Sequence, residues 1–289
     1  MTAKPLDPRR NVFRAGLAAE SLRGKVDATR FVKGSPAQIA RASVPLRKTP
    51  VASAGLETEA LFGERVQVYD AAEGWAWVQL EADRYVGYLP ADTLTPDVKA
   101  PTHRVRSIGT FVYAVPDIKS PPILHLALNS DLHVVETADP FYRLAAGGYV
   151  VSRHVAEAGR GERDFVSVAE RFLGTPYLWG GKTRIGLDCS ALVQLSLNAC
   201  GIAAPRDSDM QRDELGESVP VPDDLEGLRR GDLLFWNGHV GIMADGIMLL
   251  HANAHHMSVS IEPLPEAVAR IKGTGSVIEA VKRMAGAGL

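Results

Sequence analysis

The sequence predicts an α+β fold for the C-terminal part of the chain, preceded by two small β-barrels. Between residues 45 and 158, short runs rich in Val, Tyr and Trp recur roughly every ten residues between turns, a spacing typical of small all-β barrels. Residues 163–289 carry helical patterns first and strand-like runs afterwards, which is the order of an α+β domain.

The length and charge of the chain limit the classes of protein to consider. A chain of 289 residues is long enough for about two domains, or three if some are small. A net charge of -2 gives no basic footprint, so no nucleic-acid partner is expected. Two cysteines are too few for a disulfide framework, which favours a reducing compartment.

Residues 1–44 are predicted to form an N-terminal extension, with a weakly amphipathic helical segment at 17–26 (LAAESLRGKV). The opening residues are polar and interrupted by proline, without the apolar stretch of a secretion signal. No window approaches about 18 uninterrupted apolar residues, the length that marks a membrane-spanning helix. The start matches no lipidation motif. We therefore expect a cytoplasmic protein that does not bind membranes.

The first barrel is predicted at residues 45–98, from the strand-like runs ERVQVYD, GWAWVQLE and RYVGYLPADTL. The second, at residues 99–158, contains TFVYAV, LHVVET, FYRLA and GYVVSRHV. The two segments look like diverged copies, because the aromatic pattern from Trp75 to Tyr88 is answered by the pattern from Phe141 to Tyr149. Packing within the barrels explains these aromatic residues better than a binding surface does.

The C-terminal domain, residues 163–289, is predicted to begin with two helices. The segment DFVSVAERFLGTPY has apolar residues at helical spacing and stops at Gly174 and Pro176. The segment CSALVQLSLNACG is a second helix, ended by Gly201. The runs GDLLFW, HVGIMA, IMLLHAN and VSIEPL then read as strands of one hairpin-rich sheet.

Cys189 stands at the start of the second helix, behind a loop that contains Gly180, Gly181 and Gly186. A helix N-terminus stabilises negative charge and so lowers the pKa of a thiol there. Small residues ahead of a nucleophile let a substrate backbone approach, and backbone N–H groups can bind an oxyanion. Without its neighbours in the sequence, Cys189 is explained equally well as a core residue.

Cys200 provides an internal comparison. It lies eleven residues further along the same helix, about 16 Å along the axis, which is too far for a disulfide with Cys189. We interpret Cys200 as a buried small residue before a glycine cap.

Two histidines are placed where an activating base is needed. His239 opens a strand after the turn at Gly238, and His251 follows twelve residues later, through a turn at 244–246. Neighbouring antiparallel strands bring such residues within about 5 Å, so His251 could hold the second ring nitrogen of His239. Asp232 is interpreted as closing a turn.

The remaining histidines do not indicate a metal site. His255 and His256 follow in the next loop, and a role for them is the less favoured interpretation. The segment HANAHHM lacks carboxylate or thiolate partners at ligand spacing. We expect neither a metal nor a cofactor.

Taken in order, the segments FLGTPYLWGGKTRIGLDCSALVQ, GIAAPRDSDMQ, LRRGDLLFWNGHVGIM and LLHAN resemble the NlpC-type cell-wall cysteine peptidases, which have a papain-like fold. The resemblance covers about residues 163–285. It implies that Cys189 is the nucleophile, His239 the base and His251 the residue that orients the base, with Tyr177 in support. The chain departs from the family at Ala191, where glycine is usual.

Residues 45–155 resemble tandem bacterial SH3-like domains, and with PRDSDMQ they are similar to a narrower subgroup of dipeptidyl peptidases. These cut between γ-D-Glu and a diamino acid in peptides with a free N-terminal L-Ala. The resemblance implies that the carboxylate of Asp207 binds the ammonium. The other substrate-binding residues that it implies are Asp188, Ser190 and Ser208 in the C-terminal domain, and Glu59 and Tyr85 in the first barrel. A helix N-cap at Asp207 or Ser208 is the alternative explanation of that motif.

The favoured interpretation is an enzyme that recycles muropeptides by cutting L-Ala-γ-D-Glu-diamino acid peptides. The set of Cys189, His239 and His251 favours it over a wall-binding module, because a binding scaffold has no need of all three. A peptidoglycan endopeptidase or amidase acting on intact wall would share the nucleophile and remains the alternative.

Overall fold

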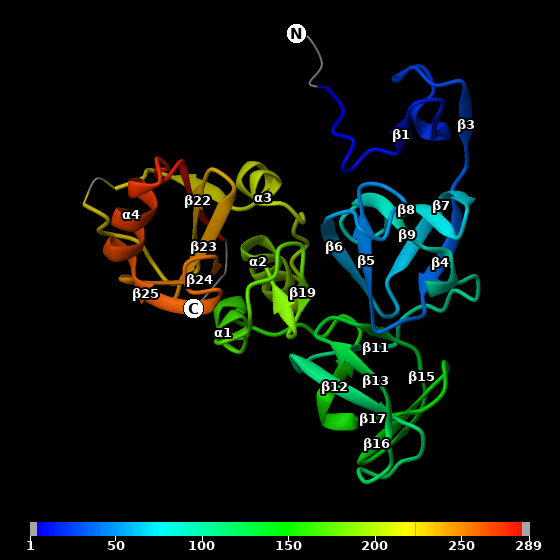
Figure 1. Ribbon diagram of the computed structural model, residues 1–289. Coiled ribbons are helices and arrows are strands. Elements are labelled where there is room, and N and C mark those ends of the chain that lie inside the picture. The colour runs from blue at the N-terminus through cyan, green and yellow to red at the C-terminus, as the bar shows by residue number, and fades with distance from the viewer. Residues whose placement is uncertain (1–4, 223, 285–289) are drawn as a thin grey trace. The chain divides into compact units, whose positions relative to one another are not determined.

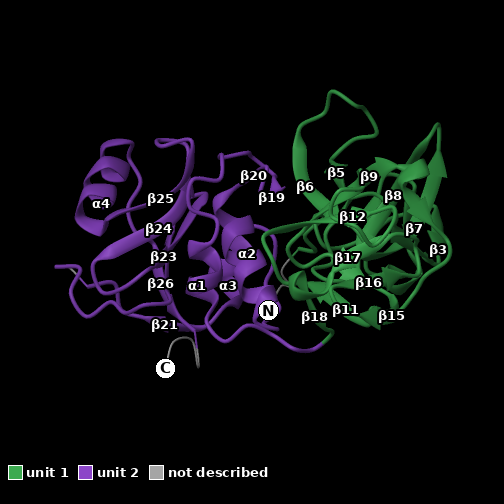
Figure 2. Ribbon diagram, turned by 90° about the horizontal axis from the view of Figure 1, so that it is seen from below, with its two compact units in different colours: residues 1–158 green, residues 159–289 purple. Residues whose placement is uncertain are grey.

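The computed structural model describes residues 5–222 and 224–284, arranged in two compact units, residues 1–158 and 159–289 (Figure 1; Figure 2). The division falls at the predicted end of the β-rich half. Residues 1–4, 223 and 285–289, which belong to the predicted extension and C-terminal domain, lie outside the described residues.

The first barrel is built on a seven-stranded sheet with the strand order β10-β4-β7-β8-β9-β5-β6. Its inward-facing apolar residues, such as Leu46, Val78 and Leu89, form one buried core, as expected where strands alternate between a packed and a solvated face. The strands are β4 (Ser35–Ile39), β5 (Ser43–Arg47), β6 (Leu56–Leu61), β7 (Arg65–Ala72), β8 (Trp75–Leu80), β9 (Val86–Pro90) and β10 (Leu94–Thr95).

The first barrel was predicted to start at residue 45, but its sheet already begins with β4 at residue 35. Strand β4 pairs antiparallel with β7, with Ala37 opposite Val66, and its buried end contributes Ile39 to the barrel core. The sequence hid this strand because Pro36 and Gln38 interrupt its apolar pattern. Residues 35–44 therefore belong to the barrel and not to an extension.

The expected helix at residues 17–26 is wrong. That stretch forms β2 (Leu17–Ala19) and one 3-10 turn, η1 (Glu20–Leu22), in a small sheet with β1 (Phe13–Arg14) and β3 (Arg30–Val32). Tertiary packing overrides the weak helical pattern, because Leu17, Ala19 and Leu22 are buried against the indole of Trp77.

The rest of the N-terminal unit consists of two small sheets, with orders β14-β11-β18 and β13-β12-β17-β16-β15. Like the first barrel, it ends with a strand, a 3-10 turn and a short strand, an order that favours the predicted repeat. The elements are β11 (His103–Val105), β12 (Gly109–Tyr113), β13 (Pro122–Ala127), β14 (Asp131–Leu132), β15 (Val134–Ala138), β16 (Phe141–Leu144), β17 (Tyr149–Val151), η3 (Ser152–His154) and β18 (Val155–Glu157), and η2 (Ala91–Thr93) is the corresponding turn of the first barrel. That this part is a second SH3-like domain stays a prediction.

The two halves of the N-terminal unit share a contact at the end of β6. Phe62 belongs to the core of the second half, beside Val105 and Leu132, and its carbonyl accepts a hydrogen bond from the Asp131 N–H at 3.0 Å. Gly63 follows with a φ of +80°, and a Cβ on it would lie 2.0 Å from the carbonyl oxygen of Asp131. Glycine is therefore required there for both backbone conformation and space.

The C-terminal unit has the predicted α+β plan: α1, α2 and α3, with the two-stranded sheet β19-β20 between the first two, precede an antiparallel sheet of order β21-β26-β22-β23-β24-β25, and α4 follows β25. The four predicted strands are confirmed. The elements are α1 (Phe165–Glu170), β19 (Lys182–Thr183), β20 (Gly186–Leu187), α2 (Cys189–Ala199), α3 (Ser208–Glu214), β21 (Glu217–Val219), β22 (Asp232–Trp236), β23 (His239–Met243), β24 (Met248–Asn253), β25 (Ser258–Pro263), α4 (Leu264–Gly273) and β26 (Ala280–Arg283).

Helix α2 is the central helix of this unit. It packs against α1 and against strands β23 and β24, and residues 189–197 are all buried, which fits a sequence that is mostly apolar on every face. Helix α4 packs against β24 and β25. Among residues 5–222 and 224–284, no helix has the length and apolar character needed to cross a bilayer.

The Gly63 contact predicts a difference between two glycine variants. Gly63→Ala should lower the free energy of unfolding of the N-terminal unit by several kcal/mol, because it adds a steric clash to an unfavourable φ. Gly74 has a similar φ of +81°, but a Cβ on it would meet nothing within 4 Å, so Gly74→Ala should cost only about 1 to 2 kcal/mol. Urea denaturation of the full chain measures both. Equal losses would show that the approach of Asp131 does not matter.

Candidate active site

Asp188 sets the start of the helix that carries the candidate nucleophile. It is the N-cap of α2, with an extended backbone, and its side chain accepts a hydrogen bond from the N–H of Ala191 at 2.8 Å. The same carboxylate accepts from the N–H of Gly180 at 2.8 Å, which ties the preceding loop to the helix. Cys189 is therefore the first residue of α2, with its sulfur at the positive end of the helix.

Two glycines of this loop, Gly181 and Gly186, serve packing, and the prediction that the loop lets a substrate approach stays a prediction. A Cβ on Gly186 would lie 2.6 Å from the side chain of Leu178, and one on Gly181 would lie 2.5 Å from the carbonyl oxygen of Gly186. The loop is thus folded closely on itself in front of the helix.

The carboxylate of Asp188 also forms a buried ion pair with Arg206. The guanidinium, 1% exposed, donates to Oδ1 and Oδ2 of Asp188 at 2.9 and 2.7 Å and to Oγ of Ser190 at 2.8 Å. No role was predicted for Arg206, although it lies in the segment PRDSDMQ. The buried polar groups beside Cys189 therefore depend on a residue that the sequence did not single out.

His239 and His251 lie side by side on the hairpin of β23 and β24, as predicted. Nε2 of His239 lies 2.9 Å from Nδ1 of His251, and the ring centroids are 5.1 Å apart. The strands pair with Ile242 opposite Leu250. The structure thus brings the predicted base and its orienting partner into hydrogen-bond contact, and it leaves Nδ1 of His239 for another partner.

The thiol of Cys189 lies next to the start of β23. The backbone N–H groups of Val240 and Ser190 hydrogen-bond the sulfur, so the strand residue that follows His239 touches the nucleophile. Tyr177 is also close: burial, and then the charge of Cys189, raise the pKa of its phenol well above the usual range. Cys189, His239 and Tyr177 are therefore gathered at one place.

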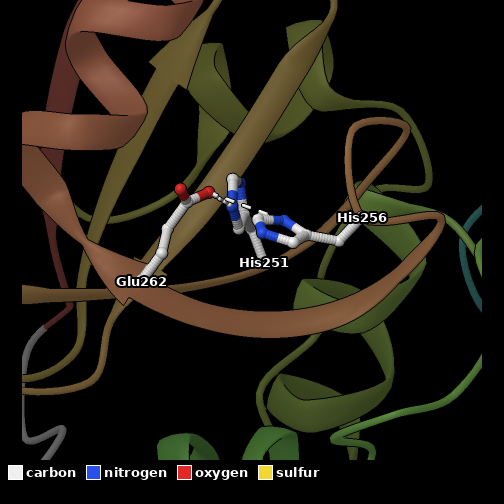
Figure 3. Close-up of side chains that lie close together, drawn as sticks. All are labelled: His251, His256 and Glu262. Carbon is white, nitrogen blue, oxygen red and sulfur yellow. Dashed lines mark hydrogen bonds and ion pairs between the residues drawn. The ribbon is translucent and has the colours of Figure 1, made fainter.

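The sequence missed two further members of this arrangement, Glu262 and Arg270. Oε1 of Glu262 lies 2.7 Å from Nε2 of His251, and Arg270 of α4 donates to Oε2 and Oε1 at 2.8 and 2.5 Å. Figure 3 shows Glu262 and His251 joined in this way. An acidic residue in the otherwise apolar run VSIEPL was the signal in the sequence.

His256 completes a group of three possible metal ligands with His251 and Glu262, whose donor atoms lie within 4.8 Å of one another (Figure 3). In this group Nε2 of His251 faces the carboxylate, and the cation of Arg270 already pairs with Glu262. A metal ion would have to displace both contacts. We therefore assign the group to hydrogen bonding, and the absence of a metal stays a prediction.

Asn253 does not take the place of His251 beside the base. Its amide nitrogen donates to Oγ of Ser260 at 2.9 Å, and its oxygen accepts from the N–H of His256 at 2.8 Å. Nε2 of His239 contacts His251 instead. The orienting position thus falls on the residue that the sequence favoured.

Burial controls the electrostatics of the reacting pair. Burial, followed by the nearby charge of Asp188, raises the pKa of the Cys189 thiol to about 12, against the opposing effect of the Val240 and Ser190 N–H groups. Burial, followed by the proximity of His251, lowers the pKa of His239 to about 3. The prediction of a lowered thiol pKa is therefore wrong for the resting site, which holds a neutral thiol and a neutral imidazole.

A cavity of about 370 Å³ opens beside the base. His239, Trp236 and Tyr177 line it next to the reacting groups, and Arg270 and His255 line it further away. The ring of Trp236 lies over His239, with centroids 5.6 Å apart. The site therefore has room for a ligand on the side of His239.

The remaining predicted residues of this unit fall near the start of α3. Asp207 is the N-cap residue of α3, but its side chain makes no cap hydrogen bond, and it and Ser208 are half-buried. Cys200 is the C-cap of α2 before Gly201, whose φ is +78°. That confirms the predicted glycine cap, although Cys200 is half-buried and not buried as expected.

Glu59 and Tyr85 belong to the N-terminal unit. Glu59 lies on β6 and is half-buried. Tyr85 is 3% exposed within the core of the first barrel, so little of its ring is left for a substrate. Their role in substrate binding stays a prediction, which the burial of Tyr85 disfavours.

The neutral resting pair predicts that alkylation of Cys189 depends on His239. Iodoacetamide should modify Cys189 in the unaltered protein and much more slowly in His239→Gln, because the thiol then has no base to take its proton. Cys200 serves as the control within the same molecule, and its rate should not change. Mass spectrometry of tryptic peptides measures both rates. An unchanged rate at Cys189 would remove His239 as its base.

The depressed imidazole pKa values predict a stability that falls with acid. The unfolded imidazoles titrate near 6.5, whereas burial holds the folded values at about 3 for His239 and about 4 for His251. Below pH 6.5 the unfolded chain therefore binds protons that the folded unit excludes. The thermal midpoint should fall between pH 7 and pH 5, less steeply in His251→Gln. The exposed His255 provides the control His255→Gln, which should keep the slope of the unaltered protein.

Comparisons with known proteins find relatives across both units. Residues 46–94 match the bacterial dipeptidyl-peptidase SH3 domain, and residues 174–274 match the NlpC/P60 family. Dipeptidyl-peptidase 6 of Lysinibacillus sphaericus is 28% identical over 242 residues, which is 75% of this chain and 87% of that protein. The gamma-D-glutamyl-L-lysine dipeptidyl-peptidase of Bacillus subtilis (strain 168) is 27% identical, over 74% of this chain and 77% of that one.

A solved structure supports the fold. The crystal structure of an NlpC/P60 family protein from Bacillus cereus ATCC 10987 superposes with a TM-score of 0.71 at 22% sequence identity, covering 86% of this chain and 99% of that one. One family model matches the first barrel, in agreement with the predicted SH3-like domain there. The chain therefore carries an NlpC/P60 domain at residues 174–274, preceded by a bacterial dipeptidyl-peptidase SH3 domain at residues 46–94.

Proposed function

We propose that this protein is a cysteine peptidase that hydrolyses the bond between γ-D-Glu and a diamino acid in peptidoglycan-derived peptides with a free N-terminal L-Ala. The observation that carries the proposal is the contact of His239 with His251, beside a cysteine at a helix N-terminus. The names of the relatives, a dipeptidyl-peptidase and a gamma-D-glutamyl-L-lysine dipeptidyl-peptidase, support the choice of bond.

The chemistry follows from which atoms are already engaged. Because Nε2 of His239 faces His251, Nδ1 is the atom that takes the proton from the thiol of Cys189 as sulfur attacks the carbonyl carbon. The backbone N–H groups at the start of α2 stabilise the oxyanion. The C–N bond then breaks, the leaving amine takes the proton from His239, and water activated by the same imidazole hydrolyses the thioester.

The neutral resting pair suits this sequence of steps. Neither the thiolate nor the imidazolium is stable alone in the buried site, so the two charges form together as attack begins. The thiol of Cys189 thus stays protonated until a carbonyl group is in place. Tyr177, close to the sulfur, can contact the oxyanion or the thiolate.

Recognition of a free amino group requires a carboxylate beside the site. Asp188 is paired with the guanidinium of Arg206, so it is a poor partner for a second cation. Asp207, the residue after Arg206, is half-buried at the start of α3, and its carboxylate is our candidate for the ammonium of L-Ala. Ser190, held by Arg206, and Ser208 supply neighbouring hydroxyl groups.

The leaving side of the substrate would occupy the cavity beside His239. Its volume of about 370 Å³ is in the range of small-molecule sites, and the imidazole of His255 lines it. A diamino acid has a carboxylate to which that imidazole could donate a hydrogen bond. Arg270 also lines the cavity, but its guanidinium is already paired with Glu262. The cytoplasmic location and the role in muropeptide recycling remain part of this proposal.

The proposal predicts cleavage of L-Ala-γ-D-Glu-diaminopimelate into L-Ala-γ-D-Glu and diaminopimelate, detected by mass spectrometry. Cys189→Ala should abolish turnover with little change in the thermal midpoint. N-acetylation of the peptide should lower kcat/KM by about a thousandfold, because the carboxylate that binds the ammonium is left without its partner.

Asp207→Asn should shrink the difference between free and acetylated peptide, whereas Asp209→Asn, at an exposed position of the same helix, should keep it. Comparable turnover of both peptides by the unaltered protein would replace this proposal with an endopeptidase on intact wall. Failure to cleave either peptide would contradict the choice of bond.

A further inference from the structure

We propose that Glu262, held by Arg270, fixes the direction of the hydrogen bonds through His251 to His239 and thereby keeps Nδ1 of His239 unprotonated and ready to accept the thiol proton. The inference rests on the proposed peptidase function for its kinetic consequence, but not for the protonation state itself. Glu262 and Arg270 act through His251, so they are positioning residues.

The first step is that Glu262 can only accept hydrogen bonds. Arg270 donates to both of its oxygens, at 2.8 and 2.5 Å, in the bidentate geometry that favours an ionised carboxylate. Burial acts to raise the pKa of Glu262, but the hydrogen bonds from Arg270 and His251 outweigh it and hold that pKa below its usual range. His256 is the other titratable group that faces it, 3.9 Å away.

The second step fixes the tautomer of His251. Its Nε2 lies 2.7 Å from Oε1 of Glu262, and because the carboxylate has no hydrogen to give, Nε2 must carry one. Burial, partly offset by Glu262, lowers the pKa of His251 to about 4, so the ring is neutral and has a single N–H. Nδ1 of His251 is therefore an acceptor.

The third step fixes the direction of the hydrogen bond between His251 and the base, His239. Nε2 of His239 lies 2.9 Å from the acceptor Nδ1 of His251, so Nε2 of His239 must donate. Because His239 is also neutral, its Nδ1 keeps a lone pair. The opposite direction would place a hydrogen on that Nδ1, and His239 could then not take the proton of Cys189.

The fourth step concerns the charge that forms during attack. When His239 becomes an imidazolium, its Nε2–H keeps the same hydrogen bond to His251, and no hydrogen has to move along the chain. The charge of Arg270 opposes that cation more than the charge of Glu262 favours it, so the pair gives the charged base no net electrostatic support. Glu262 therefore acts by selecting the tautomer before the reaction and by keeping the same hydrogen bonds in place during it.

The protonation state can be measured without any substrate. In the full chain labelled with ¹⁵N-histidine, both rings should carry their hydrogen on Nε2 at neutral pH, with the signals assigned by their loss in His239→Gln and His251→Gln. A hydrogen on Nδ1 of either ring in the unaltered protein would overturn the proposal, whatever the enzyme cleaves.

The kinetic consequence is tested by removing both charges together, so that neither is left unpaired. Glu262→Leu/Arg270→Leu should lower kcat by about a hundredfold with little change in KM, since only activation of the base is affected. The matched control is Asp232→Leu/Arg283→Leu, which removes another buried carboxylate paired with an arginine, at 2.8 and 2.7 Å, at the far end of β22. Arg270→Lys should retain most of the activity.

The outcomes separate the two proposals. Equal loss of kcat in both double variants would show that Glu262 contributes only as a buried ion pair and would overturn the inference. An unaltered protein that shows Nε2–H on both rings but does not cleave the peptide would contradict the proposed function and leave the tautomer assignment standing.

Discussion

The carboxylate of Asp188 is the interaction on which the catalytic half of the molecule depends. It caps α2 through the N–H of Ala191, holds the preceding loop through Gly180, and pairs with the guanidinium of Arg206. The preceding loop, the start of α2 and Arg206 therefore meet at one buried side chain. Loss of either partner of such a pair leaves an uncompensated charge at a cost of about 3 to 5 kcal/mol, so the position of the Cys189 thiol and the stability of the unit are set by the same group.

A second carboxylate, Glu262, plays the corresponding part for the base. Each of the two acids is paired with an arginine, Arg206 in one case and Arg270 in the other. The arginines neutralise charge that would otherwise destabilise the buried site. Cys189 and His239 are neutral at rest, and the charged residues of the site are the paired acids and arginines next to them. Charge therefore forms on Cys189 and His239 only when the sulfur attacks.

The reacting residues could be predicted from sequence because their cues are local. His239 and His251 flank a single tight hairpin, so spacing alone predicts that the two meet. Cys189 follows a helix cap, and its place beside them was implied by the resemblance to the NlpC-type peptidases. Glu262 and Arg270 could not be predicted, because a function for an acidic residue on a strand depends on which side chains the fold brings to it. Glu262 lies opposite Leu249 in the sheet and reaches His251, two positions further along β24, only through its side chain. Arg206 escaped because its partner Asp188 lies 18 positions earlier in the sequence, and no local pattern joins the two.

The errors in the N-terminal half have the same origin. The apolar residues at Leu17 and Leu22 fit a helix weakly, and only their burial against Trp77 decides for an extended chain with one tight turn. Strand β4 contains Pro36, which argues against a strand by itself, yet its pairing with β7 places it in the sheet.

Phe62 and Gly63 bear on how separable the halves of the N-terminal unit are. Phe62, directly after β6 of the first barrel, packs in the core of the second half. Gly63 allows its backbone to approach that of Asp131. A fragment ending at residue 98 would lose the partner surface for Phe62 and expose an aromatic ring to water. The two halves of the N-terminal unit are therefore not independent modules joined by a tether. A chimera that took one half from another chain would have to rebuild the contact at Phe62 and Gly63.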